Sequence, residues 1–267
     1  MSIRLPAQAG AFYPSGDKEI AEFFGSVPEP EKKDAVCAIV PHAGWIYSGS
    51  TALKALKNLA PASTVIMLGP DHYGISRRAG IYPHDCIWKL PNGELACSPK
   101  VKEMKSACPW LSEVDIKYDR EHSLEVLLPF LIEHFGSSAQ LVPLIMYDYE
   151  KEKMNEIAEA VLGIIREGKG SAALIGSSDF SHFVPAARAQ KNDMLVIDRI
   201  LALDHGALHS AVKENDVSMC GLGPVYITTF IAASLGLRPE LLEYTSSGAV
   251  TGDDRDVVAY AGIVFRK

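Results

Sequence analysis

Short apolar runs alternate along the chain with stretches whose apolar positions recur every three or four residues. The runs are VCAIVP (36–41), TVIMLGP (64–70), QLVPLIM (140–146) and AALIG (172–176). Unbroken apolar runs of this length are typical of strands that are buried on both faces, as in parallel sheets. We therefore expect these four runs to form the core strands of a sheet.

Between and after these runs, apolar residues recur at the three- and four-residue spacing of a helix. This spacing occurs at Leu53, Leu56 and Ala60; at Leu124, Leu127, Leu128 and Leu131; at Met154, Ile157, Val161 and Ile164; and at Met194, Ile197 and Leu201. Pro129 should kink or shorten the second of these helices, because proline lacks the N–H that a helix interior needs. The segment from Pro224 to Leu235 is apolar nearly all round, which predicts a helix packed inside the protein.

Strand signals complete the pattern. CIWKLPNGELAC (86–97) has Asn-Gly between two strand-like flanks and predicts a hairpin. LLEYTSS (241–247) and DVVAYAGIVF (256–265) predict closing strands. Strand–helix alternation indicates the α/β class. With no internal repeat, low-complexity tract or linker, we expect residues 1–267 to form a single domain, with a mixed central sheet and helices on both faces.

Composition and charge narrow the class of protein. The chain is 48% hydrophobic and 22% charged, as in ordinary soluble domains. Its net charge of −7 and the absence of a Lys/Arg cluster argue against a nucleic-acid partner. The longest apolar stretch, VYITTFIAASLGL, is too short and too polar to span a bilayer, and the start lacks a signal-peptide pattern. Five cysteines without any CxxC suit reduced thiols, so we expect a cytoplasmic protein.

Polar residues collect where three of the expected strands end. His42 follows the first run, Asp71 and His72 follow the second, and Asp179 and His182 follow the fourth, in LIGSSDFSH. In open α/β sheets, ligands sit beyond the carboxyl ends of the strands. If these strands are parallel neighbours, their polar side chains converge on one site.

Each of these residues also has a plainer role. A single histidine after a strand commonly makes hydrogen bonds within its loop, and Asp179 could cap a helix. The repetition at three strand ends favours a common site. Imidazoles from two strands with one anionic ligand can hold iron, zinc or copper. The anion could be Asp179 or Cys220.

Cys220 stands in SMCGLGP, just before the predicted apolar helix. A thiolate is favoured near a helix N-terminus, although a free cysteine is more often a small buried hydrophobic residue. In REHSLEVLLPF, His122 is a capping residue or lies behind the metal ligands, in contact with them but not with the metal. Glu125 there could simply complement a helix dipole.

The remaining sequence signals exclude some classes of site. We interpret His84, His134, His205 and His209 as surface residues. The chain has no GxGxxG, GxxxxGK[ST], GxSxG or HExxH motif, so nucleotide binding and serine-hydrolase chemistry lack their usual support.

Together these segments resemble the Memo family. RLPAQAGAFYP, VPHAGWIYSG, LGPDH, EHSLEVLLPFL, SSDFSH, MCGLGP and the closing strand occur in the family's order and cover nearly the whole chain. In eukaryotes the name stands for a mediator of receptor-driven cell motility. In bacteria and archaea a Memo-like protein typically accompanies a radical-SAM protein, so the resemblance implies such a partner. The family's fold is similar to that of the class III extradiol ring-cleaving dioxygenases, which hold non-haem iron with two histidines and a carboxylate.

The resemblance also implies a set of site residues. His42 and His72 would bind the metal, and Cys220 would stand where those dioxygenases keep their carboxylate. Asp179 and His182 would line the same pocket, with His182 placed like the acid/base histidine. A thiolate is softer than a carboxylate and is itself oxidisable, so a metal pocket is implied more strongly than ring cleavage.

Three functions compete at this stage. The first is an iron-dependent oxidoreductase, with copper or zinc as alternative metals, that acts on a small oxidisable substrate while His182 moves protons. The second is a module in which a pocket edged by Trp45, Tyr47 and Tyr73 binds a small molecule or a peptide; the resemblance to eukaryotic Memo proteins implies phosphotyrosine peptides. The third is a Cys220/His hydrolase working by covalent catalysis.

Overall fold

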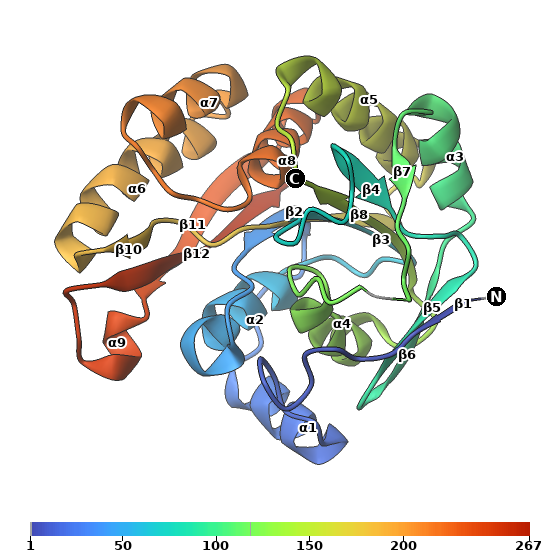
Figure 1. Ribbon diagram of the computed structural model, residues 1–267, viewed down its shortest axis with the longest axis horizontal. Helices are drawn as coiled ribbons and strands as arrows, with labels where there is room; N and C mark the ends of the chain where they lie inside the picture. The colour runs from blue at the N-terminus through green and yellow to red at the C-terminus, as the bar shows by residue number, and fades with distance from the viewer. Residues whose placement is uncertain (1, 118) are drawn as a thin grey trace.

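The computed structural model describes residues 2–117 and 119–267. It is an α/β structure with a mixed sheet between layers of helices (Figure 1). The strands are β1 (Ser2–Arg4), β2 (Ala35–Val40), β3 (Thr64–Pro70), β4 (Ala79–Ile81), β5 (Cys86–Leu90), β6 (Gly93–Cys97), β7 (Ser112–Glu113), β8 (Gln140–Met146), β9 (Ala172–Ser177), β10 (His182–Val184), β11 (Arg238–Ser246) and β12 (Val257–Arg266).

Helices connect these strands. They are α1 (Asp17–Ser26), α2 (Ser50–Lys57), α3 (Lys100–Ala107), α4 (Leu128–Phe135), α5 (Lys151–Glu167), α6 (Ala186–Leu201), α7 (His205–Glu214), α8 (Leu222–Ser234) and α9 (Gly248–Thr251). A π-helical turn (Trp45–Gly49) precedes α2, and a 3-10 turn (Glu125–Leu127) precedes α4. Pro129 lies in the first turn of α4, so the proline shortens this helix as expected.

The sheet brings the predicted core strands together in parallel. Its order is β1-β5-β6-β8-β3-β9-β2-β12-β10, with β11 also paired to β12. β9 lies between β2 and β3 and is parallel to both, while β8 is parallel to β3. The hairpin expected at 86–97 is the antiparallel pair β5 and β6. The carboxyl ends of β2, β9, β3 and β8 therefore meet at one edge of the sheet.

Helices cover both faces of this sheet (Figure 1). On one face, α2 packs against β2 and β12, α4 packs against β6, and α1 packs against α4. On the other face, α8 packs against β2, β3 and β9, α5 packs against α8, and α3 packs against α5. Because helices cover both faces of the sheet, the central strands have continuous apolar sequences.

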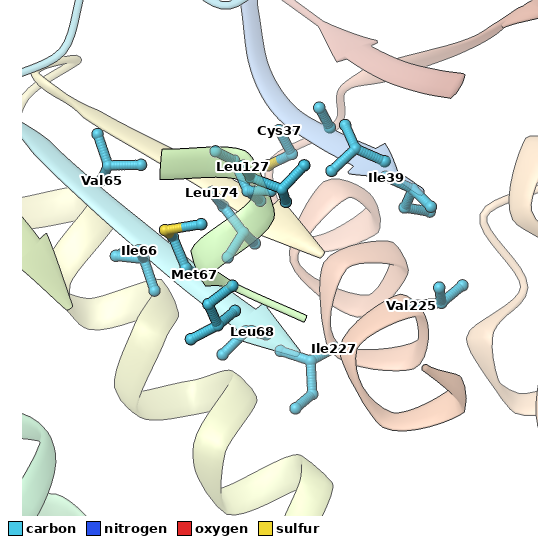
Figure 2. Packing of buried hydrophobic residues seen from close by; sticks show 14 of the residues in the cluster. Cys37, Ile39, Val65, Ile66, Met67, Leu68, Leu127, Leu174, Val225 and Ile227 are labelled. Atoms are coloured by element: carbon cyan, nitrogen blue, oxygen red, sulfur yellow. The ribbon is translucent and has the colours of Figure 1, made fainter. Parts of the chain in front are cut away.

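The core lies between β2, β3, β9 and α8 (Figure 2). Cys37, Leu68, Leu174 and Ile227 have no exposed surface. Close packing at this point depends on Gly176 in β9, because a Cβ there would lie 2.4 Å from Thr228 Oγ1 of α8. The buried layer anchors the strands whose ends carry the polar residues.

The cysteines and the helices show two further features. All five cysteines are free thiols. Within residues 2–117 and 119–267, no helix combines the length and the apolar character needed to cross a bilayer.

Candidate metal centre

Three histidines meet at the carboxyl edge of the parallel strands. His42 follows β2, His72 follows β3, and His122 comes from the segment that leads into the 3-10 turn. One ring nitrogen of each lies within 4.8 Å of a ring nitrogen of the other two. The His72 and His122 rings are stacked, with centroids 4.4 Å apart, and the His42 ring stands nearly perpendicular to both. Such a cluster has the donor atoms for a metal ion.

Hydrogen bonds fix the tautomer of His42. Its Nδ1 lies 2.7 Å from the hydroxyl of Ser177, and that hydroxyl donates to the Ser123 carbonyl at 2.8 Å. Because the hydroxyl has one hydrogen, it must accept from His42 Nδ1–H. Burial, together with the neighbouring histidines, holds the pKa of His42 well below its usual value. His42 is therefore neutral, and its Nε2 carries a lone pair.

A buried carboxylate orients His72. Glu121 is fully buried, and its Oε1 lies 2.9 Å from His72 Nδ1. The same carboxylate accepts the backbone N–H groups of His72, His122 and Ser123 at 2.6 to 2.9 Å. Burial alone would raise the pKa of Glu121, but these hydrogen bonds outweigh it and hold the pKa below its usual value. An ionised Glu121 makes Nδ1 the donor and leaves Nε2 of His72 free for a metal.

His122 has an unsatisfied ring nitrogen. Burial, and then repulsion from His72, lowers the pKa of His122 to about 4, so the ring is neutral at pH 7. Its Nδ1 is buried and lies 3.5 Å from Glu121 Oε1, but it makes no hydrogen bond to any residue that the structure describes. Buried polar atoms without partners are rare in native proteins. A neutral imidazole whose buried nitrogen makes no hydrogen bond, beside two other imidazoles, fits a site for a metal ion.

Cys220 lies directly against His42. Its Sγ is 3.3 Å from His42 Nε2 and accepts the backbone N–H of Asp179 at 3.3 Å. Burial, and then the charge of Asp179, raises the pKa of the Cys220 thiol. The start of α8 was expected to favour the thiolate, but burial has the larger effect and keeps the sulfur protonated in the metal-free protein. Sulfur and nitrogen ligands of one zinc-sized ion lie about 3.5 Å apart at a tetrahedral angle, which the observed separation nearly matches.

The residues of the SSDFSH segment take different positions. Asp179 is buried and accepts the backbone N–H of His42 at 2.8 Å, so it holds the His42 loop rather than capping a helix. Burial raises the pKa of Asp179 to about 6, although the His42 hydrogen bond opposes the rise. His182 is partly exposed, and its Nδ1 lies 2.8 Å from the Ser218 carbonyl. A carbonyl only accepts, so Nδ1 carries the proton and Nε2 of His182 is free to accept another.

Several other residues occupy positions that differ from those expected from the sequence. Asp71 accepts from Ile75 and Ser76 and closes its own turn. The interpretation of Trp45 as an edge of the pocket is wrong, because its indole is buried and stacks on Phe130 with centroids 3.8 Å apart. Of the four histidines assigned to the surface, His84 is exposed, while His134, His205 and His209 are partly buried.

Glu125 has a larger role than complementing a helix dipole. It is buried and accepts from Arg4, from the backbone of Ala7 and Gln8, and from the Tyr13 hydroxyl. This carboxylate fastens the N-terminal segment, which delivers Phe12 to the His122 ring at 4.8 Å. Glu121 and Ser177 were not among the predicted site residues. The Glu-His pair in REHSL was the available signal for Glu121, since carboxylates commonly orient metal-binding histidines.

Fold and site together define a class of α/β proteins with a histidine cluster at the carboxyl ends of parallel strands. Comparisons with known proteins identify the family within it. The model of the Memo-like protein family matches residues 4–264, so the chain belongs to this family. MEMO1 family proteins from Methanopyrus kandleri and Aquifex aeolicus are 35% and 32% identical, with at least 99% of each chain covered.

A solved structure supports the fold. The crystal structure of an uncharacterised protein from Escherichia coli K12 is similar, with a TM-score of 0.51 and 13% sequence identity. The alignment covers 84% of this chain and 98% of the other. At this identity the similarity concerns the architecture alone.

Proposed function

We propose that this Memo-family chain is a metal-dependent oxidoreductase that uses iron and acts on a small oxidisable substrate. The observation that carries the proposal is the group of three imidazoles whose nitrogens lie within 4.8 Å of one another. His42, His72 and His122 would supply nitrogen, and Cys220 would supply the anionic ligand. Copper and zinc are the alternatives, because imidazole and thiolate also suit them.

The chain's own groups prepare this site for chemistry. A bound transition metal would supply a Lewis acid and a redox centre. Ser177 and Glu121 hold the Nδ1 atoms of His42 and His72, so that the Nε2 atoms of both rings are left for a metal. His182 is the proton carrier in this proposal, because its Nδ1–H is held by the Ser218 carbonyl and its Nε2 can accept a proton from a bound substrate.

One observation favours ligand binding without chemistry as a second candidate. Tyr47, Tyr73, Tyr147 and Phe183 are 40% to 75% exposed and follow β2, β3, β8 and β9, at the edge that carries the histidines. Exposed aromatic residues around a site are suited to holding a small molecule or a peptide. The raised pKa of Cys220 weakens the third function, a hydrolase with a cysteine nucleophile.

Metal analysis after anaerobic reconstitution with Fe(II) tests the proposal. His42→Ala, His72→Ala and His122→Ala should lose bound iron, while the exposed His84→Ala keeps it as the matched control. X-ray absorption should show a sulfur neighbour that disappears in Cys220→Ser. His182→Ala should keep iron and lose oxygen consumption with oxidisable substrates.

For each of these experiments, a specific outcome would contradict the proposal. Full iron content in the three single variants would refute the histidine site. A metal coordinated only by nitrogen and oxygen would move the anionic role to Asp179. Ligand binding without oxygen consumption, with or without metal, would favour the binding module.

A further inference from the structure

A cavity lies at the end of the sheet opposite the histidine cluster. It occupies about 350 Å³ and opens beside the first residues of β2 and β9. The last turn of α5 and the segment after α8 complete its walls. Because the histidines follow the other ends of these parallel strands, this cavity is separate from the candidate metal centre.

The walls of the cavity are apolar. They are formed by the side chains of Val36, Ala60, Ile165, Ala172, Leu235 and Leu237. Four of these six are almost fully buried, while Ala60 and Leu235 are partly exposed. Partly exposed apolar residues over a buried apolar floor leave room for an apolar group to replace water.

Positive charge surrounds the same cavity. Arg166, Lys169 and Lys267 contribute to its lining, and no acidic side chain does. None of the three takes part in an ion pair with any described residue. Lys267 Nζ lies 3.6 Å from the position that a Cβ would occupy on Gly170, so the ammonium group lies over the wall of the cavity. A chain of net charge −7 thus gathers three unpaired cations at one apolar opening.

The three cations come from different parts of the chain. Arg166 lies in the last turn of α5, where a cation also complements the helix dipole. Lys169 lies in the turn that follows, and Lys267 directly follows β12. The helix dipole accounts for one of them but not for the convergence of all three.

We propose that this cavity binds a single-chain carboxylate, with its tail on the apolar walls and its head group among Arg166, Lys169 and Lys267. Size sets the length of the chain. A group the size of a water molecule takes about 30 Å³, so a cavity of about 350 Å³ has room for roughly twelve such groups, enough for the ten heavy atoms of octanoate. Apolar walls with a few polar groups at one end are typical of such sites.

Isothermal titration of the full chain with octanoate tests this site. We expect one molecule bound per chain. Affinity should rise about fourfold per methylene from hexanoate to octanoate, which corresponds to about 0.8 kcal/mol for each buried CH₂. Octanol, which has the tail without the charge, and acetate, which has the charge without the tail, should bind much more weakly. Absence of octanoate binding, or equal binding of octanol, would overturn the proposal.

Variants of the cavity separate its two components. Ala60→Phe fills the apolar space without changing charge, and the triple variant Arg166→Gln/Lys169→Gln/Lys267→Gln removes the cations without filling it. Each should weaken octanoate binding by about tenfold or more, which corresponds to a loss of about 1.4 kcal/mol. The control Lys32→Gln/Lys89→Gln/Lys102→Gln changes three exposed lysines elsewhere and should leave binding unchanged. Equal weakening in the control would show that overall charge, not this cavity, is responsible.

A membrane surface offers the same chemistry in a different form. Vesicles of phosphatidylglycerol should not bind the chain through these cations if the ligand is a free carboxylate. Vesicle binding that is lost in the cation triple variant, with no binding of octanoate, would overturn the proposal in favour of a lipid surface. Thermal denaturation of each variant distinguishes loss of the site from loss of the fold.

Discussion

A residue that would not bind the metal itself sets the geometry of the histidine cluster. Glu121 is fully buried and accepts the imidazole N–H of His72 and three backbone N–H groups. The bonds from His122 and Ser123 fix the loop that presents His122, and the two from His72 join this loop to the segment after β3. Removing the negative charge would therefore affect two of the three proposed nitrogen ligands.

We expect Glu121→Gln to lower metal affinity by about 10- to 100-fold, as is common for partners of metal-binding histidines. The glutamine amide would point an N–H at groups that already donate, so stability should also fall, by about 1–3 kcal/mol. Competition with a chromophoric chelator measures the affinity. Glu159→Gln, an exposed change in α5, is the control. Unchanged affinity in a folded Glu121→Gln protein would contradict the orienting role.

The sequence could indicate some of these residues and not others. His42 and His72 were recognisable because each directly follows an apolar strand. Ser177 was not, since its role depends on contacts with His42 and Ser123, which are far away in the chain. Glu121 had only the adjacent His122 as a local signal, because its contact with His72 joins residues that are distant in sequence. Trp45 was misplaced for the same reason, because the π-helical turn buries its indole on Phe130, which no local pattern reveals.

Among the helices and strands, those with many buried residues could be predicted from the sequence, and those with few could not. β2, β3, β8 and β9 are covered on both faces, so their composition alone marks them. α1 buries only Ile20, and α3 buries only Val101 and Met104. Two or fewer buried positions cannot establish a helical period, which explains why these helices escaped the sequence analysis.

Glycine at the end of β3 offers a test of how strand and site are joined. A Cβ on Gly69 would lie 2.5 Å from Ser123 Oγ and 2.8 Å from Leu124 Cδ2. We expect Gly69→Ala to reduce the free energy of unfolding by about 1–3 kcal/mol, the usual cost of overpacking. The change should also weaken metal binding, because the Ser123 carbonyl holds Ser177, which holds His42.

Gly163 in α5 is the matched control. Apart from the backbone of α5 itself, no atom of the described residues lies within 4 Å of the position of its Cβ. Gly163→Ala should therefore stabilise the protein by about 0.5–1 kcal/mol, because alanine loses less backbone freedom in a helix. Urea denaturation measures both variants. A Gly69→Ala protein as stable as Gly163→Ala would refute the close packing at β3.

At the scale of the whole molecule, the N-terminal segment ties one edge of the sheet to the site. Arg4 of β1 is buried and pairs with Asp119 and Glu125. Glu125 also accepts backbone N–H groups from Ala7 and Gln8. The segment then continues to Phe12, whose carbonyl accepts the backbone N–H of Trp45. A single buried arginine therefore supports a stretch that reaches the loop after β2.

We expect Arg4→Met to lower the free energy of unfolding by about 3–5 kcal/mol, because it leaves two buried carboxylates without their cation. Chemical denaturation at pH 7 measures the loss. The exposed Arg199→Met in α6 should change stability by less than about 0.5 kcal/mol. A small effect in Arg4→Met would mean that water or rearrangement satisfies Asp119 and Glu125.

The distribution of the three histidines along the chain has a thermodynamic consequence. His42, His72 and His122 come from separate segments and are brought within 4.8 Å only by the native sheet. An unfolded chain does not present them together, so metal binds the native state preferentially. By mass action, free metal at one hundred times its Kd should stabilise the fold by about 2.7 kcal/mol.

The melting temperature should therefore rise with the logarithm of free metal concentration in calorimetry. A chelator should return it to the value of the metal-free protein, and His42→Ala should show no dependence on metal. A melting temperature that is independent of metal in the wild type would contradict this linkage. With the linkage in place, metal supply governs the lifetime of the chain as well as its chemistry. The metal-free form unfolds more often and is therefore exposed to proteases for longer.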